Sequence, residues 1–361
     1  MGYPDTFEGF MVESQTNWSD FKKQQFKPKV FGDFDIDIKI EACGVCGSDV
    51  HTITGGWGDV HLPLCPGHEI VGKAVKVGPK VKTVKTGDRV GVGAQIWACL
   101  ECKICKSDNE NYCPHQVDTY NAPYPDGTIA QGGYASHVRA HEYFTFKIPE
   151  NIPTELAAPM MCAGLTTYSP LVRAHTGPGK KVAVLGVGGL GHFGLLWASA
   201  LGAETYALSH TPAKKEDALA LGAKEFIDTS KKDWAKPWAY TFDFILNAAD
   251  MTHTFNLKEY MSTLAINGEF HNVGLPDEPL PQMMAQDFAP NGSKISGSHI
   301  GSRPEVLAML KLASEKNIKP YVQKIDISAA GCKEAVERVK VNDVHYRFTL
   351  VNYDKAFGPR E

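Results

Sequence analysis

Short apolar segments separated by glycine and proline dominate the chain between residues 30 and 150. These segments are DIDIKIEA (35–42), EIVGKAVKVG (69–78), DRVGVGA (88–94) and YASHVRAH (134–141). The first alternates polar and apolar residues, which is the pattern of a half-buried strand. This part of the chain is therefore predicted to form a compact β-rich domain with barrel-like character.

A different pattern follows the proline-containing segment IPENIP (148–153), and from about residue 180 apolar strands alternate with helical stretches. The predicted strands are KVAVLGVG, ETYALS, FDFILNAA, GEFHNVGL and KISGSHIG, and the predicted helices are GLGHFGLLWASALGA, AKKEDALALGA and a stretch around 254–264. This alternation is typical of a doubly wound parallel sheet. A further helix is predicted over 303–317, with Pro304 in its first turn, and closes this unit.

The last part of the chain returns to a strand–helix–strand pattern in YVQKIDI, AAGCKEAVERVKV and HYRFTLV. We expect this tail to fold back onto the first domain. The predicted organisation is a β-rich domain at 1–152 with a cysteine-containing lobe at about 95–115, a parallel-sheet domain at 153–320, and a return to the first domain at 321–361. A length of 361 residues is consistent with two domains.

The composition is that of an ordinary globular protein, with 43% hydrophobic and 22% charged residues. A formal net charge of −4 offers no basic surplus, so neither nucleic acid nor an acidic membrane is an expected partner. The stretch VAVLGVGGLG is too short and too rich in glycine to span a bilayer. The first residues, MGYPDTFEGFMVES, lack the features of a signal peptide, and AFGPRE matches no targeting signal. We therefore expect a cytoplasmic protein.

Four of the nine cysteines are concentrated in CLECKICKSDNENYCP, as Cys99, Cys102, Cys105 and Cys113. Because a reducing compartment disfavours disulfides, clustered cysteines there favour a metal. Their spacing is Cys-x2-Cys-x2-Cys-x7-Cys, whereas bacterial ferredoxins have three residues before the fourth cysteine. The spacing favours a closed structural zinc site of four thiolates. An iron–sulfur cluster and a disulfide pairing stay open as alternatives.

A second set of metal-binding side chains is scattered over three segments. EACGVCGSDVH carries Cys46, Ser48, Asp49 and His51, PGHEIVG carries His68 and Glu69, and PMMCAGLTTY carries Cys162. Two cysteines and one histidine form a three-ligand zinc site with one position left for water or substrate, as in catalytic centres. Each residue also has a structural interpretation: Cys162 as a small buried hydrophobe, His68 as a loop histidine and Glu69 as a surface carboxylate.

The segment VLGVGGLG places Gly186, Gly188 and Gly191 in a G-x-G-x-x-G pattern between a predicted strand and a predicted helix. In dinucleotide-binding units these glycines allow a tight turn and a close approach to the pyrophosphate, which meets the helix N-terminus. Val187, Gly189 and Leu190 complete this candidate loop. The alternative is an ordinary glycine-rich turn of an α/β protein.

The end of the next strand bears on the choice of cofactor. An NAD-binding unit places an acidic residue there for the ribose hydroxyls. This strand ends instead in Ser209, followed by His210 and, after three residues, Lys214. A hydroxyl, an imidazole and an ammonium group attract a 2′-phosphate, so NADP(H) is favoured. The neighbouring Lys215 is readily explained as a solvated helix start.

The chain resembles the zinc-dependent medium-chain alcohol dehydrogenases, in particular the cinnamyl alcohol dehydrogenase branch with its yeast-type NADP-dependent enzymes. The resemblance rests on CGVCGSDVH, GHEIVG, the four-cysteine lobe, GGYASHVRAH, CAGLTTYSPL, GVGGLG and VHYRFTLV, and extends over essentially the whole chain. It implies a Rossmann doubly wound sheet and a discontinuous GroES-like catalytic domain. It also implies two Zn²⁺ per chain, NADP(H) as cofactor and a homodimer.

The resemblance assigns roles to individual residues. The catalytic zinc would be held by Cys46, His68 and Cys162, with Glu69 as an exchangeable ligand. Asp49 would orient a ligand histidine. Ser48 would be hydrogen-bonded to the reacting oxygen, and His51 would relay the proton of that oxygen. Gly47 and Arg347 would contact cofactor phosphates, and Thr166, Val273, Ser298 and Ile300 would line the nicotinamide pocket. His210 stands where close relatives with strong NADP preference have arginine, which predicts a relaxed selectivity.

The expected activity is hydride transfer between NADP(H) and primary alcohols or aldehydes, aromatic (cinnamyl-type) or medium-chain. Trp57 and Ile300 are candidates for an apolar substrate pocket, although both can equally serve ordinary packing. One alternative is an NAD-dependent polyol or sugar dehydrogenase of the same superfamily. The alternative from a different class is an iron–sulfur electron carrier or a binding protein.

Overall fold

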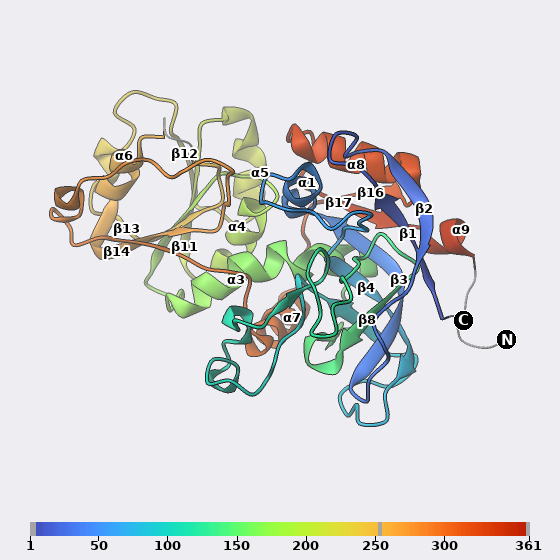
Figure 1. Cartoon of the computed structure of the whole chain (residues 1–361). Coiled ribbons are helices and arrows are strands. Elements are labelled where there is room, and N and C mark those ends of the chain that lie inside the picture. Colours follow the sequence, from blue (N-terminus) through green and yellow to red (C-terminus); the bar gives the residue numbers. More distant parts are fainter. Residues whose placement is uncertain (1–4, 252–254, 359–361) are drawn as a thin grey trace. The chain divides into compact units, whose positions relative to one another are not determined.

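The computed structural model describes residues 5–251 and 255–358, which form two compact units (Figure 1). The first unit contains the described residues of Met1–Cys162 and Ser302–Glu361, and the second consists of those of Ala163–Gly301. The sequence pattern predicted boundaries at residues 152 and 320. By packing, helix α7 (Arg303–Glu315) therefore belongs to the first unit, whereas the pattern had placed it in the second.

The first unit is built on a seven-stranded, mainly antiparallel sheet. Its strands run in the order β16 (Val322–Asp326), β17 (Arg347–Val351), β3 (Asp35–Val45), β4 (Glu69–Val77), β5 (Arg89–Val92) and β9 (Phe146–Lys147), and β8 (His137–His141) also pairs with β3. Because β17 pairs with β3, the C-terminal tail completes a sheet that begins near the N-terminus. Two small pairs lie outside this sheet: β1 (Phe7–Val12) with β2 (Phe21–Phe26), and β6 (Gln95–Trp97) with β7 (Val117–Asp118).

Strand β3 differs from the half-buried strand that its alternating pattern predicted. Ile36, Ile38 and Ile40 belong to the hydrophobic core, as expected, but Asp37 on the other face is also fully buried. Its carboxylate accepts two hydrogen bonds from Arg139, at 2.7 Å from Nε and 2.9 Å from Nη2. A bidentate arginine compensates the cost of burying a carboxylate, so the polar face of β3 needs no contact with water.

Helices complete the first unit, which also contains α1 (Gly47–Thr54), α2 (Thr154–Ala157), α8 (Ala329–Lys340) and α9 (Tyr353–Phe357). Cys332, Ala335 and Val336 on α8 recur at helical spacing and join the core of this unit. Helix α8 begins after Ser328, whose hydroxyl accepts a hydrogen bond from the backbone of Gly331 at 2.9 Å. The predicted tail of strand, helix and strand thus corresponds to β16, α8 and β17.

The second unit contains a six-stranded parallel sheet, which confirms the doubly wound fold. Its order is β12 (Glu225–Asp228), β11 (Glu204–Ser209), β10 (Lys181–Leu185), β13 (Phe242–Asn247), β14 (Leu264–Asn272) and β15 (Lys294–Gly297). The chain enters at β10, builds outward to β12 and then returns to add β13. Strand order therefore reverses beside β10, the place where such sheets bind ligands at their carboxyl edge. Strand β12 was not predicted from the sequence.

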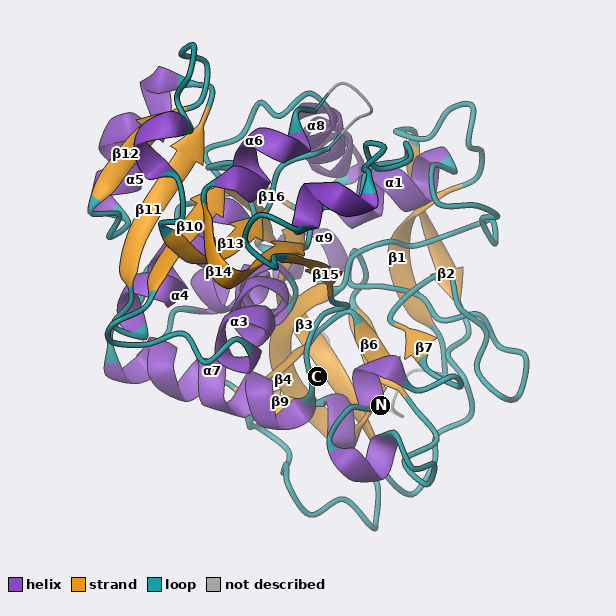
Figure 2. Cartoon of the chain, turned by 90° about the vertical axis from the view of Figure 1, so that its left-hand side faces the viewer, coloured by secondary structure: helices purple, strands orange, loops and turns teal. Residues whose placement is uncertain are grey.

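Four helices pack against this sheet: α3 (Ala163–Arg173), α4 (Gly191–Ala200), α5 (Lys215–Ala220) and α6 (Leu257–Ser262). Figures 1 and 2 show α3 and α4 on one side of the sheet and α6 on the other. Helix α6 corresponds to the helix predicted around 254–264, of which residue 254 lies outside the described residues. Across residues 5–251 and 255–358, no helix combines the length and apolar character needed to cross a membrane.

Candidate zinc and dinucleotide sites

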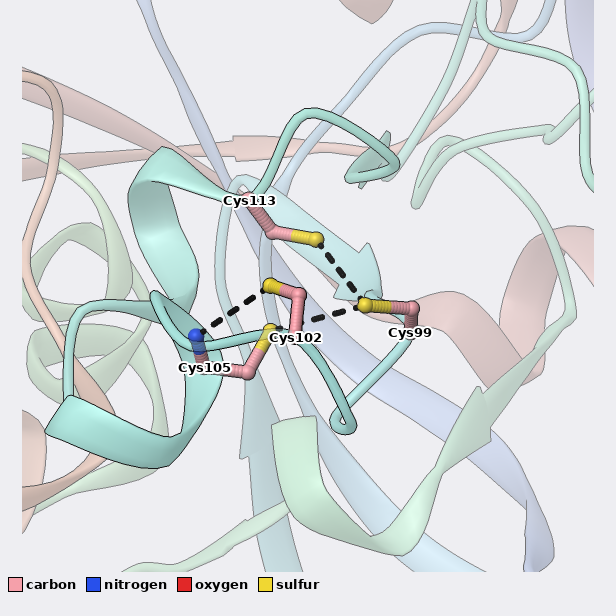
Figure 3. A group of neighbouring side chains, drawn as sticks. All are labelled: Cys99, Cys102, Cys105 and Cys113. Carbon is pink, nitrogen blue, oxygen red and sulfur yellow. Dashed lines mark hydrogen bonds between the residues drawn. The ribbon is translucent and has the colours of Figure 1, made fainter.

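The four clustered cysteines lie in the lobe that follows β6, where two short 3-10 helices (Cys105–Ser107 and Glu110–Tyr112) bring them together. Their sulfur atoms point toward one another (Figure 3) and lie within 4.8 Å of each other. The Cys99 Sγ atom lies 3.5 Å from Cys113 Sγ and 3.9 Å from Cys105 Sγ. Four sulfur atoms at about 2.3 Å from a zinc ion form a tetrahedron with edges of about 3.8 Å. The lobe therefore fits a structural zinc ion.

Thiolate chemistry and packing both agree with a metal in this lobe. Backbone N–H groups of Glu101 and Cys102 lower the pKa of the Cys99 thiol to about 6. All nine cysteines are free thiols, so the disulfide alternative for the cluster is wrong. The lobe has only a small apolar cluster of its own, in which Cys105 and Cys113 pack with Ala98 and Phe144. A metal supplies the stability that so small a core does not.

The second group of donors is entirely buried in the first unit. Cys46, His68, Glu69 and Cys162 place one donor atom each within 4.8 Å of the others, and the most exposed of these residues retains 7% of its accessible surface. Cys46 lies between β3 and α1, His68 and Glu69 lie at the start of β4, and Cys162 follows the 3-10 helix Ala158–Met161. Two sulfurs and one imidazole with a nearby carboxylate are the donor set of a catalytic zinc site.

Asp49 holds two of the candidate ligands in position. Its Oδ2 atom accepts a hydrogen bond from the backbone N–H of Cys46 at 2.9 Å, and its Oδ1 atom lies 3.7 Å from His68 Nδ1. Tyr134 Oη and the backbone N–H of Gly67 donate to the same carboxylate, each at 3.2 Å. Burial raises the pKa of Asp49. The ring of His68 is also stacked on Tyr120. Orienting contacts of this kind fix which ring nitrogen is available for a metal.

Electrostatics in this buried group favour a cation. A hydrogen bond from Cys162 lowers the pKa of the Cys46 thiol well below its usual range, and the charges of Arg347 and His68 act in the same direction. Burial lowers the pKa of His68, but Cys46 and Asp49 outweigh burial and raise it to about 9. The His68 Nε2 atom is buried and has no hydrogen-bond partner within the described ranges. A buried, unsatisfied imidazole nitrogen beside a thiolate fits zinc coordination.

Glu69 belongs to the group of four buried donors and is also hydrogen-bonded to Arg347. Arg347 Nη2 donates a hydrogen bond to Glu69 Oε1, and both residues are buried. Burial raises the pKa of Glu69 to about 7, against the opposing effect of Arg347. Gly44 faces Glu69 across the β3–β4 pair, and a Cβ atom at Gly44 would lie 1.9 Å from Glu69 Oε2. Glycine is thus required for the carboxylate to occupy this place. The resemblance had assigned Arg347 to a cofactor phosphate; within the first unit its guanidinium contacts Glu69.

Three further predicted residues lie on α1, which begins directly after Cys46. The Cys46 thiol lies 3.5 Å from Ser48 Oγ, so this hydroxyl faces the zinc ligands. The ring of His51, one turn later, is stacked on the half-exposed ring of Trp57 with centroids 4.8 Å apart and planes inclined by 5°. Gly47 is the first residue of the helix, and a Cβ atom there would meet no neighbour within 4 Å.

In the second unit, the glycine loop connects β10 to α4 at the carboxyl edge of the sheet. Gly186 has a left-handed backbone (φ 85°), and a Cβ atom at Gly191 would lie 1.7 Å from the carbonyl oxygen of Gly186. A Cβ atom at Gly188 would instead meet nothing within 4 Å, which leaves room for a ligand at that point. These are the roles expected of the glycines in a dinucleotide loop. His192 Nδ1 lies 3.1 Å from the Gly188 carbonyl oxygen and was not singled out from the sequence.

The residues predicted to bind the 2′-phosphate lie at the end of β11 and directly after it. Lys214 Nζ donates a hydrogen bond to the Val187 carbonyl oxygen at 2.7 Å, and burial lowers the pKa of Lys214. The Ser209 hydroxyl accepts a hydrogen bond from the backbone of Thr211 at 3.1 Å. His210 is exposed. The structure thus connects Lys214, though not Lys215, to the glycine loop.

The residues predicted to line the nicotinamide pocket lie on α3 and at the ends of two neighbouring strands. Val273 follows β14 and Ser298 follows β15, which pair in parallel up to Asn272 and Gly297. Ile300 is buried and has a left-handed backbone (φ 42°), which is strained for a β-branched residue and is common at functional sites. Thr166 lies within α3. Val273 and Ser298 therefore lie at the edge where such sheets bind ligands.

An asparagine pair that the sequence analysis missed joins the ends of β13 and β14. Asn247 Nδ2 donates to Asn272 Oδ1 at 2.7 Å, and Asn272 Nδ2 donates to the Gly274 carbonyl oxygen at 2.8 Å. The backbone of Val273 donates to the Asn247 carbonyl oxygen at 3.0 Å. The available signal was an asparagine at the carboxyl end of each apolar strand. Only their adjacency in the sheet shows that they fix the backbone around Val273.

A buried Cys₂His group with a neighbouring carboxylate, a four-cysteine lobe and a dinucleotide loop define a zinc-binding, dinucleotide-dependent dehydrogenase. Comparison with known proteins supports this class of protein. Residues 32–150 match the alcohol dehydrogenase GroES-like domain, and residues 189–315 match the zinc-binding dehydrogenase family. The chain belongs to the zinc-dependent medium-chain alcohol dehydrogenase family, as the sequence resemblance predicted.

Similar proteins refine this placement. The NADP-dependent alcohol dehydrogenase 6 of Saccharomyces cerevisiae is 48% identical over 99% of this chain and 100% of its own length. A cinnamyl alcohol dehydrogenase from Sorghum bicolor is 33% identical with a TM-score of 0.90, over 96% of this chain and 97% of its own. The CAD of Helicobacter pylori complexed with NADP(H) is 33% identical with a TM-score of 0.88, over 96% of this chain and 98% of its own.

Proposed function

We propose that this protein is an NADP(H)-dependent alcohol dehydrogenase and aldehyde reductase that acts on primary alcohols and aldehydes of aromatic and medium-chain types. The observation that carries this proposal is the convergence of Cys46, His68 and Cys162 on one buried point with Glu69 beside them. The similarity to NADP-dependent and cinnamyl alcohol dehydrogenases supports the cofactor and the substrate class.

Cys46, His68 and Cys162 are the proposed ligands of the catalytic ion. Zinc held there supplies Lewis acidity toward the oxygen of the alcohol or aldehyde. The low pKa of the Cys46 thiol provides a thiolate, and Asp49 keeps the imidazole of His68 oriented with Nε2 toward the sulfur atoms. Glu69 reaches the same point and serves as an exchangeable ligand, whose negative charge Arg347 balances when it is not coordinated.

Ser48 and His51 are the proposed path for the proton. The Ser48 hydroxyl lies against the Cys46 thiol and accepts or returns the proton of the reacting oxygen at Oγ. His51 lies one helical turn further on the same helix, and its imidazole passes the proton to solvent. The ring of Trp57 stacks on His51, restricts the motion of the imidazole and presents an apolar surface to aromatic substrates.

The second unit carries the proposed cofactor site. Nicotinamide supplies or accepts the hydride. The glycine loop from Gly186 to Gly191 and the following helix bind the pyrophosphate, and Ser209, His210 and Lys214 bind the 2′-phosphate. Lys214 is held beside the loop by its hydrogen bond to Val187, so its ammonium group is already oriented. Val273, Ser298, Ile300 and Thr166 line the nicotinamide pocket.

Metal analysis combined with a cofactor and substrate panel tests this proposal. We expect two zinc ions per chain, reduction of cinnamaldehyde with NADPH, and little oxidation of sorbitol with NAD. Iron in a coloured protein, or turnover restricted to sorbitol and NAD, would overturn it. Comparison with known proteins does not favour the polyol dehydrogenase alternative. Membership of a zinc-binding dehydrogenase family argues against the iron–sulfur carrier.

We also propose that the protein is a cytoplasmic homodimer. In the described part of the chain, β15 is an outermost strand of the six-stranded sheet, and such an edge can pair with that of a second copy. Leu275, Leu280 and Met284 are exposed hydrophobic side chains in the segment between β14 and β15, and a partner would bury them. Nine unpaired cysteines fit a reducing compartment. Light scattering tests the dimer, and a monomeric mass at micromolar concentration contradicts it.

A further inference from the structure

The dipeptide Asn-Gly occurs twice in the chain, as Asn267–Gly268 on β14 and as Asn291–Gly292 shortly before β15. Glycine has no Cβ atom to hinder an attack of its backbone nitrogen on the preceding asparagine side chain. Asparagine is one of the thermolabile residue types, because its side chain can lose the amide group. Since the two dipeptides are identical, a large difference in their reactivity has to come from the fold.

The side chain of Asn291 is fixed by hydrogen bonds at both of its polar atoms. Asn291 is buried, and its Nδ2 atom donates to the carbonyl oxygens of Met261 at 2.8 Å and Leu264 at 3.1 Å. Its Oδ1 atom accepts a hydrogen bond from the backbone N–H of Ser293 at 3.2 Å. The amide thus uses both N–H groups and its oxygen. Ring closure onto Gly292 would have to break these three bonds, each at a cost of about fivefold in rate.

Asn267 lies instead in a bulge of β14. Leu264 pairs with Phe242 of β13 and Glu269 pairs with Phe244, so the four residues between Leu264 and Glu269 lie opposite a single residue of β13. Asn267 is exposed and has a left-handed backbone (φ 61°). Its side-chain amide makes no hydrogen bond to the part of the chain that the structure describes. The three bonds that hold the amide of the second Asn-Gly pair therefore have no counterpart here.

We propose that Asn267 is a site of spontaneous deamidation, and that the fold leaves this Asn-Gly pair reactive while it protects the other. The backbone nitrogen of Gly268 attacks the side-chain carbonyl carbon of Asn267. A C–N bond forms, and the amide leaves as ammonia, which takes up the proton of the backbone nitrogen. One water molecule then opens the five-membered imide at either carbonyl and gives aspartate or isoaspartate. The reaction needs neither zinc nor a cofactor, so it is independent of the proposed function.

Isoaspartate should disturb β14 more than aspartate does. In isoaspartate the main chain passes through the Cβ atom, which lengthens the backbone by one carbon directly before Gly268. This stretch is crowded, since a Cβ atom at Gly268 would lie 3.0 Å from the carbonyl oxygens of Ala265 and Phe242. The backbone N–H of Asn267 also donates to the Asn291 carbonyl oxygen at 2.8 Å, which connects β14 to the segment before β15. Accumulated isoaspartate should therefore weaken this part of the sheet.

The test follows both asparagines while the zinc-loaded protein is incubated in mildly alkaline buffer. Cleavage after glutamate places them in different peptides, because Glu269 lies between them. Mass spectrometry measures the conversion of each amide to an acid, and an isoaspartyl methyltransferase with a labelled methyl donor measures isoaspartate. A parallel incubation in urea removes the fold. The variant Asn267→Gly removes the reactive amide, and glycine suits the left-handed backbone at this position.

We expect Asn267 to react about a hundredfold faster than Asn291 in the folded protein, which corresponds to three hydrogen bonds at about fivefold each. In urea the two rates should become similar. After incubation without urea, wild-type protein should unfold at a lower urea concentration than fresh protein. Incubated Asn267→Gly should keep the urea midpoint of its own fresh sample.

Three outcomes would overturn the inference. Equal rates at both asparagines in the folded protein contradict the protection of Asn291 by its hydrogen bonds. A difference of the same size in urea would assign the selectivity to neighbouring residues rather than to the fold. If Asn267 reacts in urea but stays intact in the folded protein, the bulge holds its amide away from Gly268. None of these results depends on hydride transfer, which the cinnamaldehyde assay with NADPH measures separately.

Discussion

Arg347 and Glu69 form an ion pair in which neither side chain has appreciable contact with solvent, and the pair lies within the candidate catalytic zinc site. The two residues are 278 positions apart and meet because β17 and β4 both flank β3. Removing water from two charges is unfavourable, and their mutual attraction repays that cost only while both partners are present. The pair therefore couples the C-terminal tail to the metal site.

Replacing Arg347 with methionine should leave the buried Glu69 carboxylate without its guanidinium partner. We expect a loss of about 3–5 kcal/mol in the free energy of unfolding, measured with urea on the zinc-loaded protein. The double variant Arg347→Met with Glu69→Gln should recover most of this loss, because neither charge of the pair is then buried without the other. A double variant that is as unstable as Arg347→Met alone would show that the guanidinium acts by packing rather than by charge.

Replacing Cys105 with serine should release one of two zinc ions and unfold the four-cysteine lobe. The lobe has almost no apolar core besides its cysteines, so the remaining three ligands cannot maintain its fold. Metal analysis and limited proteolysis between residues 99 and 113 measure the effect. Ser107→Ala, at an exposed serine in the same lobe, is the control and should keep both ions. Loss of hydride transfer with the fold and both zinc ions intact would contradict a structural role.

Two adjacent lysines should differ in their effect on cofactor affinity. Lys214 is half-buried and bonded to the glycine loop, whereas Lys215 is exposed at the start of α5. Lys214→Ala should raise the KM for NADPH about tenfold, which corresponds to the loss of one charge-assisted hydrogen bond. Lys215→Ala should change this KM less than twofold. Equal effects of both variants would mean that Lys214 contributes only general positive charge.

His210→Arg should strengthen selectivity for NADP. An imidazole offers a phosphate one N–H donor at a time, whereas a guanidinium is always charged and offers a bidentate contact. The expected result is a several-fold lower KM for NADPH with little change in the KM for NADH, measured at constant ionic strength. An unchanged KM for NADPH would remove His210 from the phosphate site.

His141 should make stability depend on pH. Burial lowers its pKa, and its Nδ1 atom accepts a hydrogen bond from the backbone of Tyr143 at 3.1 Å, which requires the neutral ring. The unfolded chain therefore takes up a proton at higher pH than the folded one. The contribution of His141 is complete above about pH 6.5 and is lost as the pH falls from there through the lowered folded pKa.

His141→Asn retains an acceptor near the position of Nδ1 but cannot titrate. Its stability relative to wild type should therefore rise when the pH is lowered from about 7.5 to about 5.5, as measured by urea midpoints. A difference between the two proteins that is independent of pH would exclude His141 as the titrating group.

Much of the candidate site could be predicted because its signals are local. The four lobe cysteines lie within fifteen positions, so ligand spacing alone favours zinc, and the glycine loop is recognisable between a strand and a helix. The start of one helix carries Cys46, Ser48, Asp49 and His51. Helical periodicity alone therefore places these side chains near one another, without any information on long-range contacts. The parallel sheet likewise follows from the alternation of apolar and helical segments.

Only the tertiary structure determines which polar side chains on different strands bond to one another. The sequence indicates neither that Arg347 pairs with Glu69 nor that Asp37 pairs with Arg139, and the structure shows both pairs. Nor does the sequence indicate that Asn247 bonds Asn272, or that His271 bonds Ser298. Periodicity determines which face of a strand a side chain occupies. Which strand lies alongside, and in what register, depends on the folding of the whole sheet, and a buried polar group bonds to whatever that register brings opposite it.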